Sequence, residues 1–381
     1  MSNVVRSDAP KGVEDMPGTA RDTGGAVAVR PGEGLDWAAL GAYLASELRL
    51  ADEFEVLQFP NGSANLTYLL RYPDQDLVFR RPPFGDLAPG AHDMRREFRV
   101  LSRLWEPFDR APRALLFCDD RSIVGADFLV SEFRVGEVIW GRLPESMGGL
   151  AGAARSVGLA VIDALADLHT VDPASCGLSD LGRPEGFVRR QVDGWRARWD
   201  RVATDDLDEV MRAAGAALSD SVPHSSRVSI LHNDFKIDNC QFRAGDPSRV
   251  TSIFDWDMST LGDPLIDLGL LLNYWPDPAD TGEDRALAYP GLELIGLPTR
   301  AEITARYAER SGVPVGDLSW YEAFASWKTA IVREQLHSRY VHGESSDPRM
   351  AKMHDHNLML GRRALRLVTS GAALPAVRHD D

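Results

Sequence analysis

The 381-residue sequence has little cysteine, no excess of positive charge and no long apolar run. Its three cysteines, Cys118, Cys176 and Cys240, are too few and too scattered for a disulfide framework or a zinc site, so we expect free thiols in a cytoplasmic protein. The formal net charge of −15 argues against a nucleic-acid partner. No run approaches the roughly 18 apolar residues of a membrane span, and the first residues lack the pattern of a secretory signal. We therefore expect no membrane partner, and the sequence does not indicate an oligomeric state.

The apolar content of 44% is ample for a core, and its pattern changes along the chain. Residues 1–33 mix Gly, Pro, Asp and Arg without periodicity, which predicts a disordered leader, and residues 371–381 are predicted to form a tail. Residues 34–136 are predicted to form a β-rich lobe and residues 137–370 a larger helical lobe. The predicted fold class is therefore α+β, with two lobes.

Short apolar runs separated by turn-forming residues predict strands in the first lobe, and apolar residues at helical spacing predict helices in the second. The strands are predicted at residues 54–59, 66–72, 77–81, 114–118 and 127–133, as a five-stranded sheet, with a helix near residue 35 and another at 93–105. Helices of the second lobe are predicted at 150–170, 185–201, 205–219, 264–274, 299–311, 317–340 and 349–370.

Residues 228–257 hold the densest group of polar side chains beside apolar strands. An apolar run at 228–231 leads into the polar loop His232–Asn239, and a second apolar run at 250–254 leads into Asp255. Carboxylate and amide oxygens are the hard ligands that Mg²⁺ takes, together with the phosphates of a substrate. The stretch therefore predicts a site for a metal–phosphate complex.

The spacing within this stretch matches that of phosphoryl-transfer enzymes of the protein-kinase type. Asn239 follows Asp234 by five residues, and Asp255 comes after the next strand. In that arrangement the first Asp accepts the proton of the acceptor hydroxyl, while the Asn and the second Asp hold the metal. Lys236 is placed to offset charge on the transferred phosphoryl group. The alternative is that Asp234 and Asn239 only cap a turn.

Phosphoryl transfer also needs a cation on the nucleotide phosphates, positioned by a carboxylate on a helix. Arg80 lies on the third predicted strand, and Glu97 on the following helix is its expected partner, unless Glu97 belongs to a solvated helix face. The turn that contains Gly62, Ser63 and Asn65 is a candidate cover for the phosphates, or an ordinary hairpin turn. The backbone around Glu132 and Phe133 is a candidate for adenine recognition.

Two further polar residues lie in apolar helices of the second lobe. Asp267 is costly to bury unless it is paired, so we expect it to bond the backbone or the side chain of His232. His169 ends an apolar helix, where a core or capping role is expected rather than a catalytic one. The C-terminal histidines show no clear metal-ligand spacing, because His354 and His356 are two residues apart and would point to different helix faces.

At this point the sequence resembles the aminoglycoside phosphotransferase/choline kinase family of small-molecule kinases with a protein-kinase-like fold. More narrowly, it is similar to the kinase-like module of acyl-CoA dehydrogenase fusion proteins and to free-standing bacterial relatives. The resemblance covers roughly residues 34–370. It rests on residues 61–68, 79–83, 87–93 with Glu97, 182–187 with Gln191 and Trp195, the loop 232–239, and residues 254–257 and 262–264.

The resemblance implies ATP and Mg²⁺ as cofactors, with Asp234 as the base and Asn239 and Asp255 as Mg²⁺ ligands. It places Arg80 where ordinary kinases have Lys, and Arg binds phosphate as a planar fork. Asn233 stands where many members have Gly, and Asp257 is expected to support the metal site.

The resulting hypothesis is an ATP- and Mg²⁺-dependent kinase that phosphorylates a hydroxyl group of a small molecule, with a hydroxyacyl-CoA as one acceptor. The alternatives are an aminoglycoside or amino-alcohol kinase and a nucleotide-binding pseudokinase regulator. A protein kinase is disfavoured, because the sequence has no Asp-Phe-Gly and no Ala-Pro-Glu motif. The C-terminal helices carry basic residues that are either a CoA-phosphate site or a solvated face, namely Lys328, Arg333, His337, Arg339, His342, Arg349, Lys352, His354 and His356.

Overall fold

The computed structural model describes residues 5–6, 22–60, 65–85, 93–345 and 347–371, which divide into two compact units. Unit 1 takes in the chain up to Val138 together with Ala174–Leu178 and Asn239–Ser259. Unit 2 takes in Ile139–Pro173, Ser179–Asp238 and the chain from Thr260 onward. The predicted tail from residue 372 and most of the predicted leader lie outside the described residues.

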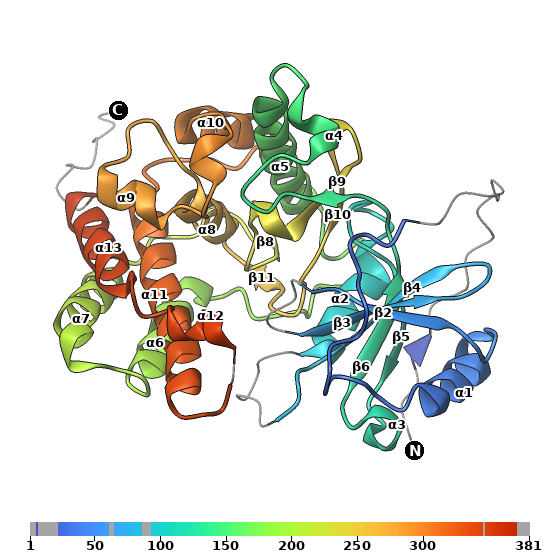
Figure 1. Ribbon diagram of the computed structural model, residues 1–381. Coiled ribbons are helices and arrows are strands. Elements are labelled where there is room, and N and C mark those ends of the chain that lie inside the picture. Colours follow the sequence, from blue (N-terminus) through green and yellow to red (C-terminus); the bar gives the residue numbers. More distant parts are fainter. Residues whose placement is uncertain (1–4, 7–21, 61–64, 86–92, 346, 372–381) are drawn as a thin grey trace. The chain divides into compact units, whose positions relative to one another are not determined.

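Unit 1 is built on a six-stranded sheet in the order β1-β5-β6-β4-β3-β2, and every pairing within it is antiparallel (Figure 1). All five predicted strands are present, and one more strand lies at the edge. The strands are β1 (Val5–Arg6), β2 (Glu55–Gln58), β3 (Leu66–Arg71), β4 (Asp76–Arg81), β5 (Ala114–Cys118) and β6 (Phe128–Glu132).

The alternation of side chains along β4 decides which residues of unit 1 enter the core. Leu77 and Phe79 are buried against Leu40 and Leu44 of α1 (Trp37–Leu48), on one face of the sheet. Successive residues of a strand point to opposite faces. Arg80 therefore faces the other side of the sheet, where α2 (Met94–Leu104) packs on β5 and β6. The short helix α3 (Arg121–Val124) precedes β6.

Residues 22–33 pack on this sheet, although the sequence places them in a disordered leader. Val27 forms a bridge with Gln58, with N–H to carbonyl distances of 2.9 and 2.7 Å. The Tyr68 hydroxyl donates to the Glu33 carbonyl at 2.7 Å. These contacts use the edge of β2 and a core tyrosine, which local composition does not reveal. Residues 1–4 and 7–21 of the predicted leader lie outside the described residues.

The segment Asn239–Ser259 belongs to unit 1 by its contacts, although the sequence analysis assigned it to the second lobe. It forms a three-stranded antiparallel sheet in the order β10-β9-β7, with a turn at Gly245 whose φ is +70°. The bounds are β7 (Glu137–Val138), β9 (Cys240–Arg243) and β10 (Asp246–Ile253). The predicted strand 250–254 is thus the end of a longer strand.

Unit 2 is helical, with one two-stranded sheet formed by β8 and β11. Helices α7, α11 and α13 lie side by side, and α8 packs on α11 (Figure 1). The helices are α4 (Glu145–Gly148), α5 (Ala153–Thr170), α6 (Phe187–Trp199), α7 (Asp205–Asp220), α8 (Leu265–Tyr274), α9 (Gly282–Leu287), α10 (Arg300–Ser311), α11 (Ser319–Val341), α12 (Pro348–Ala351) and α13 (Asn357–Gly371). The other elements are β8 (Ser229–Leu231), β11 (Thr260–Gly262), and the 3-10 turns η1 (Ile237–Asn239) and η2 (Leu292–Leu294).

The core of unit 2 depends on tryptophans and on glycines that allow helices to approach closely. Trp327 of α11 is buried, and its indole N–H donates to the Met211 carbonyl of α7 at 3.0 Å. A Cβ at Gly269 of α8 would lie 2.7 Å from the Tyr321 carbonyl oxygen of α11. The contact between α8 and α11 therefore requires glycine at position 269.

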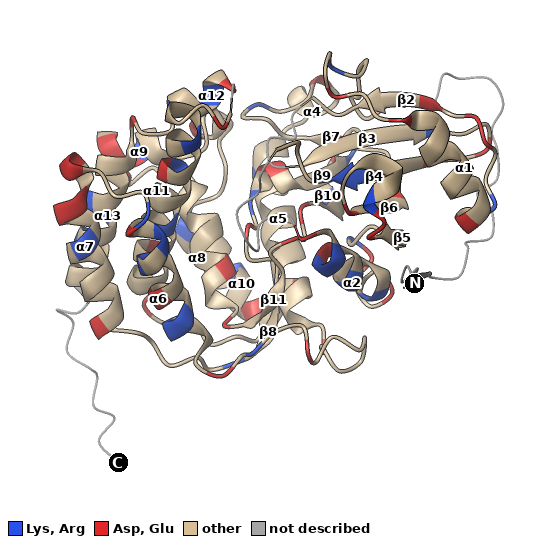
Figure 2. Ribbon diagram, turned by 90° about the horizontal axis from the view of Figure 1, so that it is seen from below, with Lys and Arg blue, Asp and Glu red and all other residues tan. Residues whose placement is uncertain are grey.

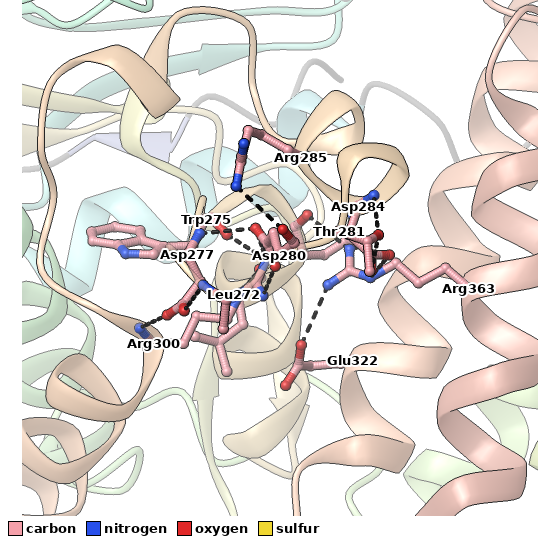
Figure 3. A network of polar contacts seen from close by, with 12 residues as sticks. Leu272, Trp275, Asp277, Asp280, Thr281, Asp284, Arg285, Arg300, Glu322 and Arg363 are labelled. Carbon is pink, nitrogen blue, oxygen red and sulfur yellow. Dashed lines mark hydrogen bonds and ion pairs between the residues drawn. The ribbon is translucent and has the colours of Figure 1, made fainter.

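A polar network fixes the loop that follows α8 (Figure 3). The Arg300 guanidinium bonds the Asp280 carboxylate at 2.5 Å and the Trp275 carbonyl at 2.6 Å. Buried Arg363 of α13 lies 3.4 Å from Glu322 and 3.6 Å from Asp284. Two arginines thus connect this loop and α9 to α10, α11 and α13.

The helix predicted at 349–370 is wrong as a single element, because the structure breaks it into α12 and α13 with a turn between them. The turn holds His354, whose ring bonds Glu334 and Asp206. Helix α9 is not predicted, since six residues are too few to show a period. No described helix combines the length and the apolarity needed to cross a lipid bilayer.

Candidate active site

Arg80 is the centre of a buried charge cluster in unit 1. Its Nη1 lies 3.0 Å from Glu97 Oε1 on α2, so the ion pair expected from the sequence is present. Its Nη2 donates to Asp255 Oδ1, at the end of β10. The Nε–H is buried and has no hydrogen-bond partner among the described residues. One guanidinium therefore joins the sheet, α2 and the β9–β10 segment, and it retains a donor for an anionic ligand.

The electrostatics of this cluster favour a permanent cation at Arg80. Burial works against the charge, but Glu97, Asp255 and Asp257 outweigh it and raise the pKa of Arg80. Burial also raises the pKa of Glu97, and Arg80 opposes that rise. Figure 2 shows basic residues in blue on α2, whose sequence places Arg95 and Arg96 directly before Glu97. Glu97 is 2% exposed, which excludes the alternative of a solvated helix face.

The backbones of Asn239 and Phe254, the residue before Asp255, pair at the end of the β9–β10 hairpin. The Phe254 N–H donates to the Asn239 carbonyl at 2.9 Å, so the two residues that the sequence predicts as metal ligands lie on paired backbone segments. Asp255 has a φ of +70°, and its side chain is 26% exposed. A non-glycine residue at positive φ is uncommon and is concentrated at functional sites. An accessible carboxylate beside an amide fits the hard oxygen ligands that Mg²⁺ takes.

Asn65 connects the turn after β2 to the same region. It is 3% exposed, and its Nδ2 lies 3.3 Å from Asp257 Oδ2. The predicted phosphate-covering residues Gly62 and Ser63 lie outside the described residues. Asn65 and Asp257 therefore place the end of that turn beside the segment that carries Asp255.

Glu132 and Phe133 lie at the end of β6, where adenine recognition is predicted. Their N–H groups donate to the carbonyls of Arg113 at 3.0 Å and Asp76 at 3.4 Å. The Glu132 carboxylate accepts from Arg134 Nε at 2.6 Å. These bonds position the segment, and its role toward adenine stays a prediction.

The loop with Asp234 belongs to unit 2 and follows β8. Lys236 Nζ lies 3.2 Å from Asp234 Oδ2 and 3.7 Å from Asp238 Oδ2, so the lysine bridges two carboxylates. Asn233 has φ of +59°. Asn tolerates this left-handed region better than most residues, so this turn does not require glycine at position 233. The turn thereby keeps the backbone shape that directs Asp234.

Asp267 anchors this loop as predicted. Its Oδ2 accepts the His232 N–H at 2.7 Å and lies 3.3 Å from His169 Nε2. The His169 Nδ1 lies 2.7 Å from the Tyr307 hydroxyl, and the histidine is 1% exposed. The expectation that His169 has a structural role is confirmed.

Lys328 is buried, although the sequence groups it with the basic residues of the C-terminal helices. It is 5% exposed, and its Nζ donates to the Asn233 carbonyl at 3.2 Å. Burial lowers the pKa of Lys328 to about 8, against the opposing effect of Asp234 and Asp267. A lysine on the otherwise apolar middle turns of a helix is the sequence signal for such burial. The basic residues of α11–α13 therefore do not form one exposed patch, and Arg349 is itself paired with Asp347 at 2.6 Å.

These elements define a phosphotransferase with a kinase-like fold: an antiparallel sheet that carries a cation–carboxylate pair, and a helical unit that carries an anchored acidic loop. The chain belongs to the phosphotransferase enzyme family, whose profile matches residues 55–303. The family supports the transfer of a phosphoryl group to a small molecule.

The curated relatives are longer proteins. Acyl-CoA dehydrogenase family member 11 of Gallus gallus is 31% identical over 302 residues, which cover 78% of this chain and 38% of that protein. Acyl-CoA dehydrogenase family member 10 of Mus musculus is 29% identical over 294 residues, which cover 77% of this chain and 27% of that protein. The chain spans less than half the length of these relatives.

Solved structures share the fold. A Ralstonia eutropha JMP134 protein, assigned by inference as an aminoglycoside phosphotransferase, superposes with a TM-score of 0.73 at 27% identity, covering 88% of this chain and 99% of that chain. The aminoglycoside phosphotransferase APH(4)-Ia, in a ternary complex with AMP-PNP and hygromycin B, gives a TM-score of 0.56 at 17% identity, covering 88% and 100%. At this identity, the similarity to APH(4)-Ia shows only a shared fold.

Proposed function

We propose that the protein is an ATP- and Mg²⁺-dependent kinase that transfers the γ-phosphoryl group of ATP to a hydroxyl group of a small molecule. The observation that carries the proposal is the guanidinium of Arg80, which is paired with Glu97 and Asp255 and retains a buried, unused Nε–H among the described residues. A fixed cation with a free donor suits a nucleotide phosphate.

On the nucleotide side, Asn239 and Asp255 would hold Mg²⁺, and Asp257 would support them through Asn65. Bound Mg²⁺ would neutralise charge on the phosphates of ATP. Arg80 would contact a phosphate oxygen through its fork, held in place by Glu97. We assign the turn with Gly62 and Ser63 to the phosphates, and the backbone of Glu132 and Phe133 to adenine, as parts of the same proposal.

On the acceptor side, Asp234 would accept the proton of the attacking hydroxyl group. Its carboxylate is 31% exposed and forms an ion pair with Lys236, with Oδ2 at 3.2 Å from Nζ. Lys236 would move from Asp234 toward the transferred phosphoryl group as negative charge leaves the carboxylate. Asp267 accepts a hydrogen bond from the His232 N–H, and Lys328 donates one to the Asn233 carbonyl. These two bonds hold the loop backbone in place while Asp234 accepts the proton.

For the acceptor we propose a hydroxyacyl-CoA. The support is that the curated relatives carry acyl-CoA dehydrogenase names, although the chain spans only part of their length. APH(4)-Ia was solved with an aminoglycoside, so aminoglycosides are the competing acceptor class. A panel of hydroxyacyl-CoAs, amino alcohols and aminoglycosides separates the two by ADP release.

The test is Asp234→Asn, assayed for ADP release with the acceptor panel and for ATP–Mg²⁺ binding by calorimetry. Removing a general base costs about 10²–10⁴-fold in kcat, while nucleotide affinity should stay within about threefold because Asp234 does not hold the metal. Asp246→Asn is the matched control, since Asp246 caps its own turn through Ser248 and has no role in the proposed site. It should leave both quantities unchanged.

Equal activity of the wild type and Asp234→Asn on every acceptor, with ATP–Mg²⁺ bound by both, would mean that the protein is a nucleotide-binding pseudokinase. A failure of the wild type to bind ATP–Mg²⁺ at all would refute both the kinase hypothesis and the pseudokinase hypothesis. Activity with aminoglycosides but not with hydroxyacyl-CoAs would refute the proposed acceptor and support the proposed kinase activity.

A further inference from the structure

Three potential metal ligands meet in unit 2, outside every segment assigned above to phosphoryl transfer. Glu334 and His337 lie three residues apart on α11, which places them on one face of the helix. His354 reaches the same point from the turn between α12 and α13. One ligand atom from each of these residues lies within 4.8 Å of the other two. The sequence does not reveal this cluster, because His354 is distant in the chain from Glu334 and His337 and lies in a turn outside their helix.

The burial and the hydrogen bonding of these groups fit a bound cation. Glu334 is 1% exposed, and its Oε2 lies 2.9 Å from His354 Nδ1. The Nδ1 of His337 is buried and has no hydrogen-bond partner among the described residues. The two imidazole rings lie 5.2 Å apart between centroids. A buried ring nitrogen without a partner is uncommon in a folded protein and points to a ligand such as an ion.

The groups behind the three ligands have the arrangement that orients metal-bound side chains. His354 Nε2 lies 3.1 Å from Asp206 Oδ2, in the first turn of α7. Asn357 Nδ2 donates to Glu334 Oε2 at 2.7 Å. Metal-bound histidines nearly always donate their second N–H to a carboxylate or carbonyl, which fixes the tautomer. If Nε2 carries the proton that faces Asp206, the lone pair of His354 is on Nδ1, which would bind the metal in place of its present contact with Glu334 Oε2.

We propose that Glu334, His337 and His354 bind a divalent transition-metal ion of the Zn²⁺ class, with the fourth position open to water. The ligands would be a Glu334 carboxylate oxygen and the Nδ1 atoms of both histidines. Zinc ligands at about 2.0–2.1 Å in a tetrahedron lie about 3.3 Å apart, so small side-chain movements close the site. Two imidazoles favour Zn²⁺ over Mg²⁺, which takes oxygen ligands. The ion ties α11 to the turn before α13.

The experiment uses the full chain after treatment with a chelator, titrated with Zn²⁺ in an excess of Mg²⁺ and followed by calorimetry. We expect one Zn²⁺ per chain with a dissociation constant below about 1 μM, because three side-chain ligands are already gathered. His337→Gln and His354→Gln should each weaken binding by at least about 100-fold. His356→Gln is the matched control, since His356 is exposed and lies outside the cluster, and it should bind Zn²⁺ as the wild type does.

Two further measurements separate loss of the site from loss of the fold. Circular dichroism of the zinc-free variants should match the zinc-free wild type. Asp206→Asn changes an exposed residue and should weaken Zn²⁺ binding by about tenfold, since it removes only the partner of His354. Co²⁺ should give the intense visible absorption of a four-coordinate site in the wild type and lose it in His337→Gln. Absence of Zn²⁺ binding below about 100 μM, or stoichiometric binding that persists in both histidine variants, would overturn the proposal.

Discussion

At the scale of residues, Arg80 is held at both ends of its guanidinium, by Glu97 at one nitrogen and Asp255 at the other. Lysine has one ammonium group and cannot satisfy two carboxylates in that fixed planar geometry. The arginine therefore has a structural duty within unit 1 in addition to its proposed contact with phosphate. Because Arg80 has both a structural role and a proposed phosphate contact, substitution by lysine and substitution by methionine should have different effects.

Arg80→Lys should keep the positive charge and lose the fork, so we expect the KM for ATP to rise about tenfold with kcat nearly kept. Arg80→Met removes the positive charge that faces Glu97 and Asp255, so kcat/KM for ATP should fall by at least about 100-fold. Steady-state kinetics with varied ATP measure both. Arg71→Met, on the neighbouring strand and paired with Asp76, is the control and should leave KM unchanged. An unchanged KM in both Arg80 variants would contradict the role of Arg80.

Buried Lys328 should make the free energy of unfolding depend on pH in the alkaline range. Its pKa is about 8 in the folded chain and 10.5 in its ordinary state, so between these values the unfolded chain binds more protons. The free energy of unfolding contributed by Lys328 therefore rises with pH across this window, by about 2 kcal/mol from pH 7.5 to 9.5. Lys328→Met lacks this rise.

Urea unfolding of the wild type and Lys328→Met at pH 7.5 and pH 9.5 tests this linkage. The wild type should gain stability relative to the variant as the pH rises. Lys352→Met, which changes an exposed lysine, should follow the wild type at both pH values. A constant difference between the wild type and Lys328→Met would mean that folding does not lower the pKa of Lys328.

The sequence predicts some of these residue contacts and not others. It predicts the Arg80–Glu97 pair, because phosphoryl transfer needs a cation positioned by a helix carboxylate and the predicted strand and helix offer these two residues. It does not predict φ of +70° at Asp255, since no local signal favours the left-handed region for Asp there. It also misplaces Lys328, because periodicity shows which helix face a residue occupies but not which loop covers that face.

At the scale of elements, the loop after α8 depends on Arg300 more than on its own sequence. Arg300 bonds the Asp280 carboxylate and two carbonyls, and Asp280 has 4% of its side chain exposed (Figure 3). Breaking a mostly buried pair by removing one partner leaves an uncompensated charge. This element should therefore be sensitive to single substitutions at positions 280 and 300.

Arg300→Met should lower the free energy of unfolding by about 3 kcal/mol. Arg155→Met removes an arginine from an exposed pair with Glu302 and should cost less than about 1 kcal/mol. Urea unfolding of both variants at one pH provides the comparison. Equal losses in the two variants would show that the network of Figure 3 does not hold the loop.

Element prediction succeeds where the apolar period is long and fails where tertiary contacts decide. Helices α5, α6, α7, α8, α10 and α11 begin and end within a few residues of the predicted bounds. The break between α12 and α13 is not predicted, because it depends on His354 bonding side chains of α7 and α11. The edge strand β1 is missed for the same reason, since its two residues are assigned as a strand through their pairing with β5.

At the scale of the whole molecule, the predicted fold class and family are confirmed, whereas the acceptor is not determined by either. A family fold specifies the nucleotide chemistry more closely than the acceptor, because the acceptor is selected by side chains that vary while the fold is kept. The roles proposed above divide between the units: Arg80, Asn239 and Asp255 belong to unit 1, and Asp234 belongs to unit 2.

Hydrogen exchange with the two substrates added separately tests this division. A non-hydrolysable ATP analogue with Mg²⁺ should slow exchange in β4, α2 and the segment 239–257, because its proposed ligands lie there. A hydroxyacyl-CoA added alone should slow exchange in the loop 232–238 and in unit 2 helices, and leave β4 unchanged. Asp255→Asn should abolish the effect of the ATP analogue and keep that of the acceptor. Protection of α2 and β4 by the acceptor alone would contradict the assignment, since it would place acceptor binding on unit 1.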